Sequence, residues 1–275
     1  MQLPDYINIE QPEDYTLLIR IRPGVVAICV YKPHSGGNFY YEEVGLSSGN
    51  DISAEIQQLV LDSDFLTLPY GRVNVIYVSR DYDLIPSYII QKDKKDILYN
   101  FTHSKHADQI LYSEDIIQQI ATAYNTDGEL YQFLSRNLNN PVFFHHSNLL
   151  MLYLEQRNKE IRDRAKMYIH FHNQYMDIFC YDKSSQILHA VTHEGENDKN
   201  LVYHTLNMWD KSGFDQNEDS LFILSSSAEI NLYVPSMLSE YIKNIKQIRI
   251  SGESSPLHNN TNKELPLDMI IVSAK

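Results

Sequence analysis

The sequence predicts an α/β protein made of two similar halves. Residues 18–32 and residues 168–182 each read as a pair of short strands, and the two stretches align without a gap at a shift of 150 positions. A third strand, a helix and a further strand follow in the same order in each half. Short amphipathic hairpins resemble each other by chance, but the recurrence of the whole ordered series favours an internal duplication.

The first half opens with a hairpin. Leu17–Arg22 alternates apolar and polar residues, Val25–Tyr31 is rich in β-branched residues, and Pro23-Gly24 between them predicts a tight turn. Further along, three runs have strand, helix and strand character in turn: residues 39–46, 52–60 and 73–78. The helix has a capping candidate in Asp51 or Asn50, and its apolar residues fall on one face.

The second half repeats this order. Its successive elements are strands at 167–172, 175–181 and 186–192, a helix face within 201–209, and a strand at 220–224. Beyond them, Val234-Pro235-Ser236 matches Ile85-Pro86-Ser87 at a shift of 149, and each Pro-Ser pair predicts a helix start because proline fits the first turn. Each half then offers another strand, at 142–146 and 247–251.

The halves differ between these elements. The first half carries an insertion at about 90–136, where one helix is expected from residues that share a face: Ile116, Ile117, Ile120, Ala121 and Tyr124. A helix over 149–164 runs into a charged connector, so the domain boundary is placed near Asp163, with domains at 1–163 and 164–275. The apolar run Leu265–Val272 is expected to be a last strand.

Composition limits the function classes. A net charge of −13 over 275 residues argues against a nucleic-acid or anionic-membrane binder, because both need clustered positive charge. No apolar stretch is long enough to cross a bilayer, and the polar, acidic first residues do not read as a signal peptide. The cytoplasm is the expected compartment. Cys29 and Cys180 fall in strand-like runs of the two matching repeats, where buried free thiols are expected.

Three antiparallel strands, a helix and strand–helix units, present twice, resemble the actin-like ATPase superfamily, whose halves are ribonuclease H-like. The Ile-Pro-Ser and Val-Pro-Ser elements and the paired His145-His146 are similar to those of a family of uncharacterised bacterial proteins with this fold. That family is distantly similar to the cytoplasmic actin-like protein of pilus assembly. The resemblance covers nearly the whole chain and implies an actin-like fold.

The resemblance also implies where ATP would lie, between the halves, with an Asp-x-Gly turn in the first hairpin of each. Arg20-Ile21-Arg22 and His170-Phe171-His172 stand at these two places, without the acid or the glycine. A basic side chain does not ligate Mg²⁺ as a carboxylate does, and a side chain in place of glycine blocks close backbone approach. The phosphate-binding motifs are therefore degenerate, and no cofactor is predicted; ATP with Mg²⁺ is the disfavoured alternative.

Candidate ligand-binding residues can still be named for the cleft that the resemblance implies: Arg20, Arg22, His170, His172, Ser251 and Gly252. Alternation puts each strand pair on one face, where it could hold an anion; the favoured alternative is that these are partly exposed polar positions at strand ends. Ser251-Gly252 follows a strand about where the family has a glycine-rich adenosine loop. No catalytic residue is predicted, and no metal site, because no Cys or acidic cluster completes a zinc ligand set around the histidines.

The leading hypothesis is a non-enzymatic cytoplasmic adaptor or scaffold that acts through protein contacts. It implies a protein partner, no nucleic acid and no membrane insertion, and leaves a homodimer open. The alternative is an atypical nucleotide-binding ATPase, a small-molecule kinase or a sensor that uses the cleft. Candidate catalytic groups for an active enzyme are Asp81, Asp83 and Asp177, which lie near turns or on the second strand of a hairpin.

Overall fold

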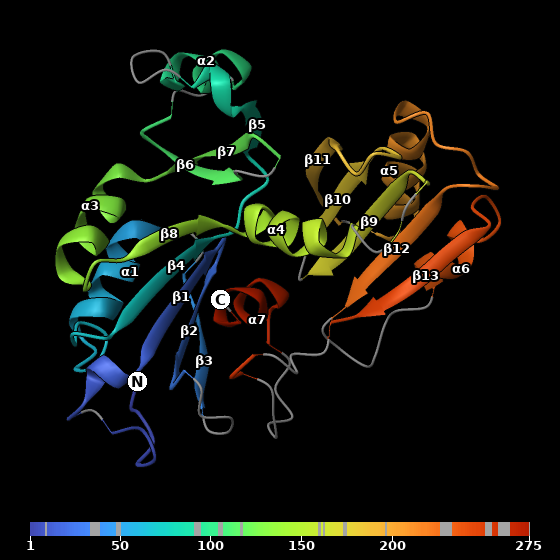
Figure 1. The fold of residues 1–275 in the computed structure, drawn as a ribbon. Coiled ribbons are helices and arrows are strands. Elements are labelled where there is room, and N and C mark those ends of the chain that lie inside the picture. The colour runs from blue at the N-terminus through green and yellow to red at the C-terminus, as the bar shows by residue number, and fades with distance from the viewer. Residues whose placement is uncertain are drawn as a thin grey trace. The chain divides into compact units, whose positions relative to one another are not determined.

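The computed structural model divides the chain by packing into two units. The first comprises Met1–Leu149, Gly252–Thr261 and Asp268–Lys275, and the second comprises Leu150–Ser251 and Asn262–Leu267. Within them the structure describes residues 1–8, 10–33, 39–47, 51–90, 95–103, 107–115, 118–158, 161, 163–172, 175–195, 197–225, 233–250, 255–257 and 265–274. Figure 1 shows the elements of both units in chain order.

A five-stranded sheet in the order β3-β2-β1-β4-β8 forms the centre of the first unit. Its strands are β1 (Thr16–Arg22), β2 (Val25–Tyr31), β3 (Phe39–Gly45), β4 (Arg72–Tyr77) and β8 (Val142–His145). The first three are antiparallel neighbours, whereas β4 runs parallel to β1 and β8 parallel to β4. The predicted hairpin turn is confirmed, with Gly24 at φ +75°, a conformation that glycine adopts without a steric penalty.

Helices cover this sheet in ways that the local sequence explains. After the short 3-10 helix η1 (Pro12–Asp14), the first α-helix is α1 (Ile52–Leu61), where the Asp51 side chain accepts hydrogen bonds from the Ser53 and Ala54 backbone amides. α1 packs against α3 (Gly128–Asn137), which Asp127 caps in the same way. α7 (Leu267–Ser273) returns from the end of the chain to the first unit.

The insertion in the first half folds as a small sheet of its own. β5 (Tyr82–Pro86), β7 (Ile120–Thr126) and β6 (Gln109–Asp115) lie side by side in that order. The 3-10 helix η2 (Ser87–Ile89) and α2 (Lys95–Thr102) join β5 to β6. A small apolar cluster holds this sheet together, and its buried members are Ile85, Tyr99, Ile110 and Ala123.

The second unit is built on a sheet with the order β11-β10-β9-β12-β13. Its strands are β9 (Lys166–His172), β10 (Tyr175–Tyr181), β11 (Ile187–Glu194), β12 (Ser220–Ser225) and β13 (Asn244–Arg249). Three antiparallel strands are again followed by two parallel ones, so the two sheets share strand order and directions. The predicted α/β fold of two similarly built halves is confirmed.

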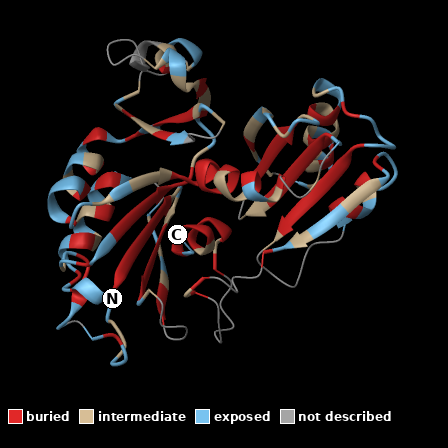
Figure 2. Ribbon diagram, viewed as in Figure 1, coloured by how far each residue is buried: buried red, intermediate tan, exposed pale blue. Residues whose placement is uncertain are grey.

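One face of the second sheet carries the main apolar core of this unit. α5 (Asp198–Lys211) and α6 (Tyr233–Leu238) pack on it through residues such as Trp209 and Leu238, against Ile169 and Ile178 of the strands. On the other face, the Tyr168 hydroxyl donates to Asn158, at the end of α4 (His146–Asn158). Figure 2 shows the buried centre of each sheet in red. In the described part of the chain, no helix is long and apolar enough to cross a membrane.

Three sequence expectations were wrong. The helix expected around Ile120 and Tyr124 is strand β7, whose central place between β5 and β6 buries both of its faces and removes the alternation typical of a half-exposed strand. Ile116 and Ile117 lie outside the described residues. The strand expected at Leu265–Val272 is helix α7. The first Pro-Ser pair ends β5 and starts a 3-10 turn instead of an α-helix.

The division into units differs from the expected domains 1–163 and 164–275. It falls inside α4, between Leu149 and Leu150, and the last helix packs with the first unit. A buried ion pair between Arg20 of β1 and Asp268 of α7 explains that return.

Candidate functional site

Arg20 lies in the middle of β1 and is 2% exposed. Its Nε is 2.9 Å from Oδ1 and 2.8 Å from Oδ2 of Asp268, which is 3% exposed. The Asp268 Oδ1 also accepts the backbone amide of Met269, so the carboxylate is fixed by its own helix. Arg20 Nη1 is buried and has no hydrogen-bond partner among the described residues. The arginine charge is thus neutralised inside the first unit, while the Nη1 amino group is left without a partner among the described residues.

Arg22 stands two positions further along the same strand face and is more exposed. Its Nη2 is 3.6 Å from Oε2 of Glu43 on β3. The side-chain exposures of the two residues are 17% and 40%, so water screens this pair and its energetic contribution is small. The structure therefore places both predicted arginines on one face of the first sheet, each beside an acidic side chain.

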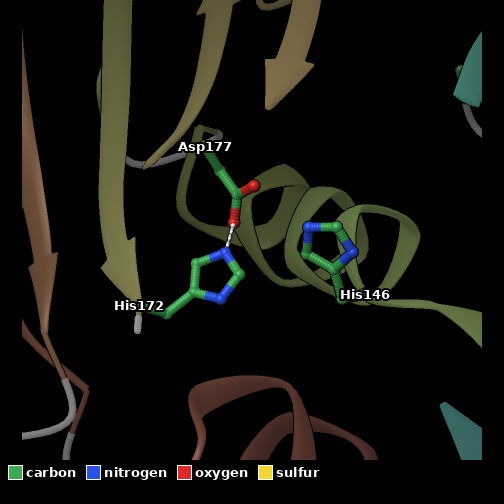
Figure 3. A group of neighbouring side chains, drawn as sticks. All are labelled: His146, His172 and Asp177. Carbon is green, nitrogen blue, oxygen red and sulfur yellow. Dashed lines mark ion pairs between the residues drawn. The ribbon is translucent and has the colours of Figure 1, made fainter. Parts of the chain in front are cut away.

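His170 and His172 occupy the corresponding strand of the second unit, and both contact one carboxylate. Asp177 on β10 lies directly across from His170 in the strand register and is fully buried. Its Oδ2 is 3.3 Å from His170 Nδ1 and 2.8 Å from His172 Nε2. Figure 3 shows the second of these ion pairs; His146, also drawn there, belongs to the first unit.

The neighbouring contacts fix this histidine–aspartate cluster. Thr192 of β11 donates its hydroxyl to Asp177 Oδ1 at 2.7 Å, so the two carboxylate oxygens have different partners. The rings of His170 and His172 are stacked with their centroids 4.8 Å apart and their planes at 12°. Because strand alternation puts both imidazoles on one face, they reach the same carboxylate without any distortion of the backbone.

The remaining sequence candidates do not join these residues. Asp81 is exposed and lies 3.8 Å from Nε of its neighbour Arg80. Asp83 accepts a hydrogen bond from Thr102 and lies 3.4 Å from His103 Nδ1. Both belong to the first unit, whereas Asp177 belongs to the second. Ser251 and Gly252 lie outside the described residues.

Sequence reasoning missed Asp268 as a partner of Arg20, and Asp177 as a partner of the histidines. Asp268 is the only charged residue in the run Leu265–Val272, and a charge inside an apolar run signals a buried partner elsewhere. For Asp177 the signal was the two-residue connection between β9 and β10, since a hairpin loop of known length fixes the register.

A comparison with protein-family models matches residues 4–245 to the family described as protein of unknown function, DUF3822. The chain belongs to this family. A comparison with curated proteins gave no match. The family membership fits the resemblance inferred from the Pro-Ser elements and the repeated hairpins.

Solved structures show which fold this DUF3822 chain shares. A Bacteroides thetaiotaomicron protein with an actin-like ATPase fold and unknown function is similar with a TM-score of 0.80 and 21% identity, over 98% of this chain and 99% of that one. The PilM–PilN type IV pilus biogenesis complex gives a TM-score of 0.45 at 11% identity, over 88% of each chain. The first similarity shows an actin-like ATPase fold; the second is too low to carry an argument.

Proposed function

We propose that this DUF3822 protein is a non-catalytic, cytoplasmic actin-like adaptor or scaffold that works through protein contacts. One observation carries the proposal: the strand position where the resemblance puts the first phosphate-binding turn holds the buried Arg20–Asp268 ion pair. A phosphate brought to Arg20 would meet the Asp268 carboxylate beside it, and like charges at that distance repel. Mg²⁺ would meet a carboxylate that is already paired with a guanidinium.

The second unit supports the same proposal. At the corresponding strand, His170 and His172 both pair with Asp177, a buried acid of their own hairpin. That acid is therefore not positioned to organise a hydrated Mg²⁺ in the way an Asp-x-Gly turn does. In both units, charged side chains at these strand positions lie beside a side chain of opposite charge in the same unit.

Exposed aromatic residues supply the contact surface that an adaptor needs. Tyr88 is 80% exposed and Phe101 is 87% exposed, and they lie on η2 and α2, the two helices that join β5 to β6 in the insertion of the first unit. Large apolar rings are rarely left in water, because their burial contributes about 2–3 kcal/mol each, and they are enriched at protein interfaces. We place the partner-binding surface on this insertion.

A nucleotide titration tests the lack of phosphate binding. Purified full-length protein is titrated with ATP and Mg²⁺ while the heat of binding and the melting temperature are measured. We expect no heat and no shift, since a bound nucleotide raises the melting temperature by mass action. Micromolar binding with turnover of ATP overturns the proposal.

A second experiment tests the contact surface. Photo-crosslinking in cells of the source organism is compared for the wild type, Tyr88→Ser and Phe101→Ser, with Tyr203→Ser as control, because Tyr203 is 63% exposed but lies in the second unit. We expect one discrete crosslinked species that both insertion variants lose and the control keeps. The same species in all four proteins contradicts the placement of the surface.

A ligand-binding sensor is the second candidate function, and Arg20 Nη1 favours it. A buried guanidinium nitrogen without a hydrogen-bond partner among the described residues is costly and could be satisfied by a small anion. Titration with inorganic phosphate separates this function from the adaptor: a phosphate-dependent rise in melting temperature supports the sensor, and no shift supports the adaptor.

A further inference from the structure

A cavity in the second unit lies beside the C-terminal end of α5. Its volume is about 430 Å³, and it is lined by residues of α5, of the loop between α5 and β12, and of the turn between α6 and β13. Three aromatic side chains line it, those of Trp209, Phe214 and Tyr241. All of its described lining residues belong to one unit, so the cavity does not depend on how the two units are placed.

The way in which α5 ends builds the aromatic wall of this cavity. The backbone amide of Phe214 donates to the Trp209 carbonyl, and the amide of Gly213 donates to the Asp210 carbonyl, which is the Schellman ending of a helix. This ending brings Phe214 back onto Trp209, and the two rings meet edge to face with their centroids 5.3 Å apart. Trp209 is 3% exposed, whereas Tyr241 is 49% exposed, so the wall has a fixed inner ring and an outer ring that a ligand can reach.

Hydrogen bonds fix the loop that forms another side of the cavity. Asp219 accepts the Asp215 amide at 2.8 Å and, through its other oxygen, the Ala165 amide at 2.9 Å, just before β9. Asp215 in turn accepts the backbone amides of Asn217 and Glu218 through Oδ1. The cavity is therefore formed before a ligand arrives, which lowers the entropic cost of binding.

The electrostatics of the cavity favour a cation. Its described lining residues include Asp210 and Asp215 and no lysine or arginine. The C-terminal end of α5 adds the negative end of a helix dipole, and the faces of aromatic rings attract cations, those of tryptophan most strongly. An arginine guanidinium suits such a lining well, because it stacks flat on aromatic rings and pairs with carboxylates through a planar set of donors.

Two features favour a peptide over a free cation. The indole Nε1–H of Trp209 is buried and has no hydrogen-bond partner among the described residues, although buried indoles usually have one. Gln216 and Asn217 are exposed lining residues, and side-chain amides offer both donors and acceptors, which match a peptide backbone. A peptide carries carbonyl oxygens for such donors, whereas a free guanidinium has none. A volume of about 430 Å³ is enough for one long side chain and lies at the lower end of ligand cavities.

We propose that this cavity binds an arginine side chain of a basic peptide segment, with its guanidinium against the rings of Trp209 and Tyr241 and paired with Asp210. The net charge of −13 attracts such a segment from solution. The proposal does not rest on the adaptor function, and it concerns a different unit from the insertion that carries Tyr88 and Phe101.

Trp209 is the only tryptophan of the chain, so its fluorescence and its indole N–H resonance report on this cavity alone. Full-length protein is titrated at low salt with the peptide Gly-Gly-Arg-Gly-Gly, blocked at both ends, and with the same peptide carrying citrulline, which keeps the shape of arginine without its charge. We expect a saturable change of both signals with the arginine peptide and none with the citrulline peptide. No saturable change with the arginine peptide, or an equal change with both peptides, overturns the proposal. An equal affinity for free arginine amide rejects the peptide as the occupant.

Variants separate this site from a general attraction between a basic peptide and an acidic protein. Asp210→Asn removes a lining charge and Tyr241→Leu removes the outer ring, and each is expected to weaken binding about threefold. Glu218→Gln is the matched control and should bind as the wild type does, since Glu218 is an exposed acid of the same loop that is not among the lining residues. Asp210 and Tyr241 are exposed, so these variants should keep the melting temperature of the wild type. Equal affinities of Asp210→Asn and Glu218→Gln for the arginine peptide reject the site.

Discussion

Arg20 and Asp268 form a buried ion pair although 248 positions separate them in the sequence. The contact ties the last helix of the chain to the central strand of the first sheet. Two charges taken out of water are stable only when paired, so each residue depends on the other for its place in the fold.

Removing one partner of this pair is expected to destabilise the first unit strongly. Arg20→Met or Asp268→Leu leaves an uncompensated buried charge and should lower the free energy of unfolding by about 3–5 kcal/mol. The double variant removes both charges, so its loss in free energy of unfolding should be clearly smaller than the sum of the losses of the two single variants. Urea unfolding followed by circular dichroism measures these differences.

Arg22→Met is the matched control for this cycle. Arg22 lies on the same strand face, but its pair with Glu43 is partly exposed, so the change is expected to stay below about 1 kcal/mol. Equal losses in the free energy of unfolding of Arg20→Met and Arg22→Met would show that the buried ion pair stabilises the fold no more than the exposed pair.

The strands that could be predicted are those marked by a turn, by alternating polarity or by the repeat. β1, β2 and β10 follow turns or alternate in polarity, and their order repeats, so both sheets could be drawn from the sequence. β7 and α7 could not be, because each is apolar over most of its length, and at seven residues a buried strand and a buried helix have the same pattern. Only the tertiary partners decide between them: β5 and β6 for β7, and Arg20 for α7.

The candidate site was predictable in part for the same reason. Arg20, Arg22, His170 and His172 could be placed on matching strands from the repeat alone. Their acidic partners depend on contacts across strands or across the whole chain, which a linear motif does not contain. The pairing of Asp177 with His170 follows from hairpin register, but the pairing of Arg20 with Asp268 follows from no local rule.

Gly71 is expected to resist substitution because two backbone segments meet there. A Cβ at this position would overlap the Glu13 carbonyl oxygen, and the Gly71 amide donates a hydrogen bond to the Tyr15 carbonyl. Gly71→Ala should lower the free energy of unfolding by about 1–3 kcal/mol through strain. Gly45→Ala is the control, since a Cβ there meets nothing within 4 Å. Thermal unfolding compares the two variants. Equal melting temperatures for Gly71→Ala and Gly45→Ala would contradict the close approach of Gly71 to the Glu13 backbone.

His193 is expected to make the second unit sensitive to acid. Burial lowers its pKa to about 4, and the nearby His204 and Lys211 act in the same direction. In the unfolded chain a histidine titrates near about 6.5, so between these values the unfolded state binds more protons. The stabilisation is therefore fully present above about pH 6.5 and is lost as the pH falls toward about 4.

Replacement of His193 checks this dependence. In the wild type, the urea midpoint should decline between about pH 7 and pH 4.5, and His193→Gln should make this decline smaller because it removes the titrating imidazole. That imidazole is stacked on His204, with the two ring centroids 4.0 Å apart. His189→Gln, an exposed neighbour on the same strand, should leave the decline unchanged. If the urea midpoint of His193→Gln falls with pH as steeply as that of the wild type, other groups cause the acid sensitivity.

The two cysteines are expected to report the unfolding of the two units separately. Cys29 on β2 and Cys180 on β10 are fully buried, and burial raises the pKa of both thiols, that of Cys180 to about 12. Thiolate is the reactive form, so a disulfide reagent should label neither thiol in the native protein and both in the denatured protein. Because each unit has its own sheet, Cys180→Ala should be labelled at a different urea concentration from Cys29→Ala. Labelling of both variants at one concentration means that the units unfold as a single cooperative structure.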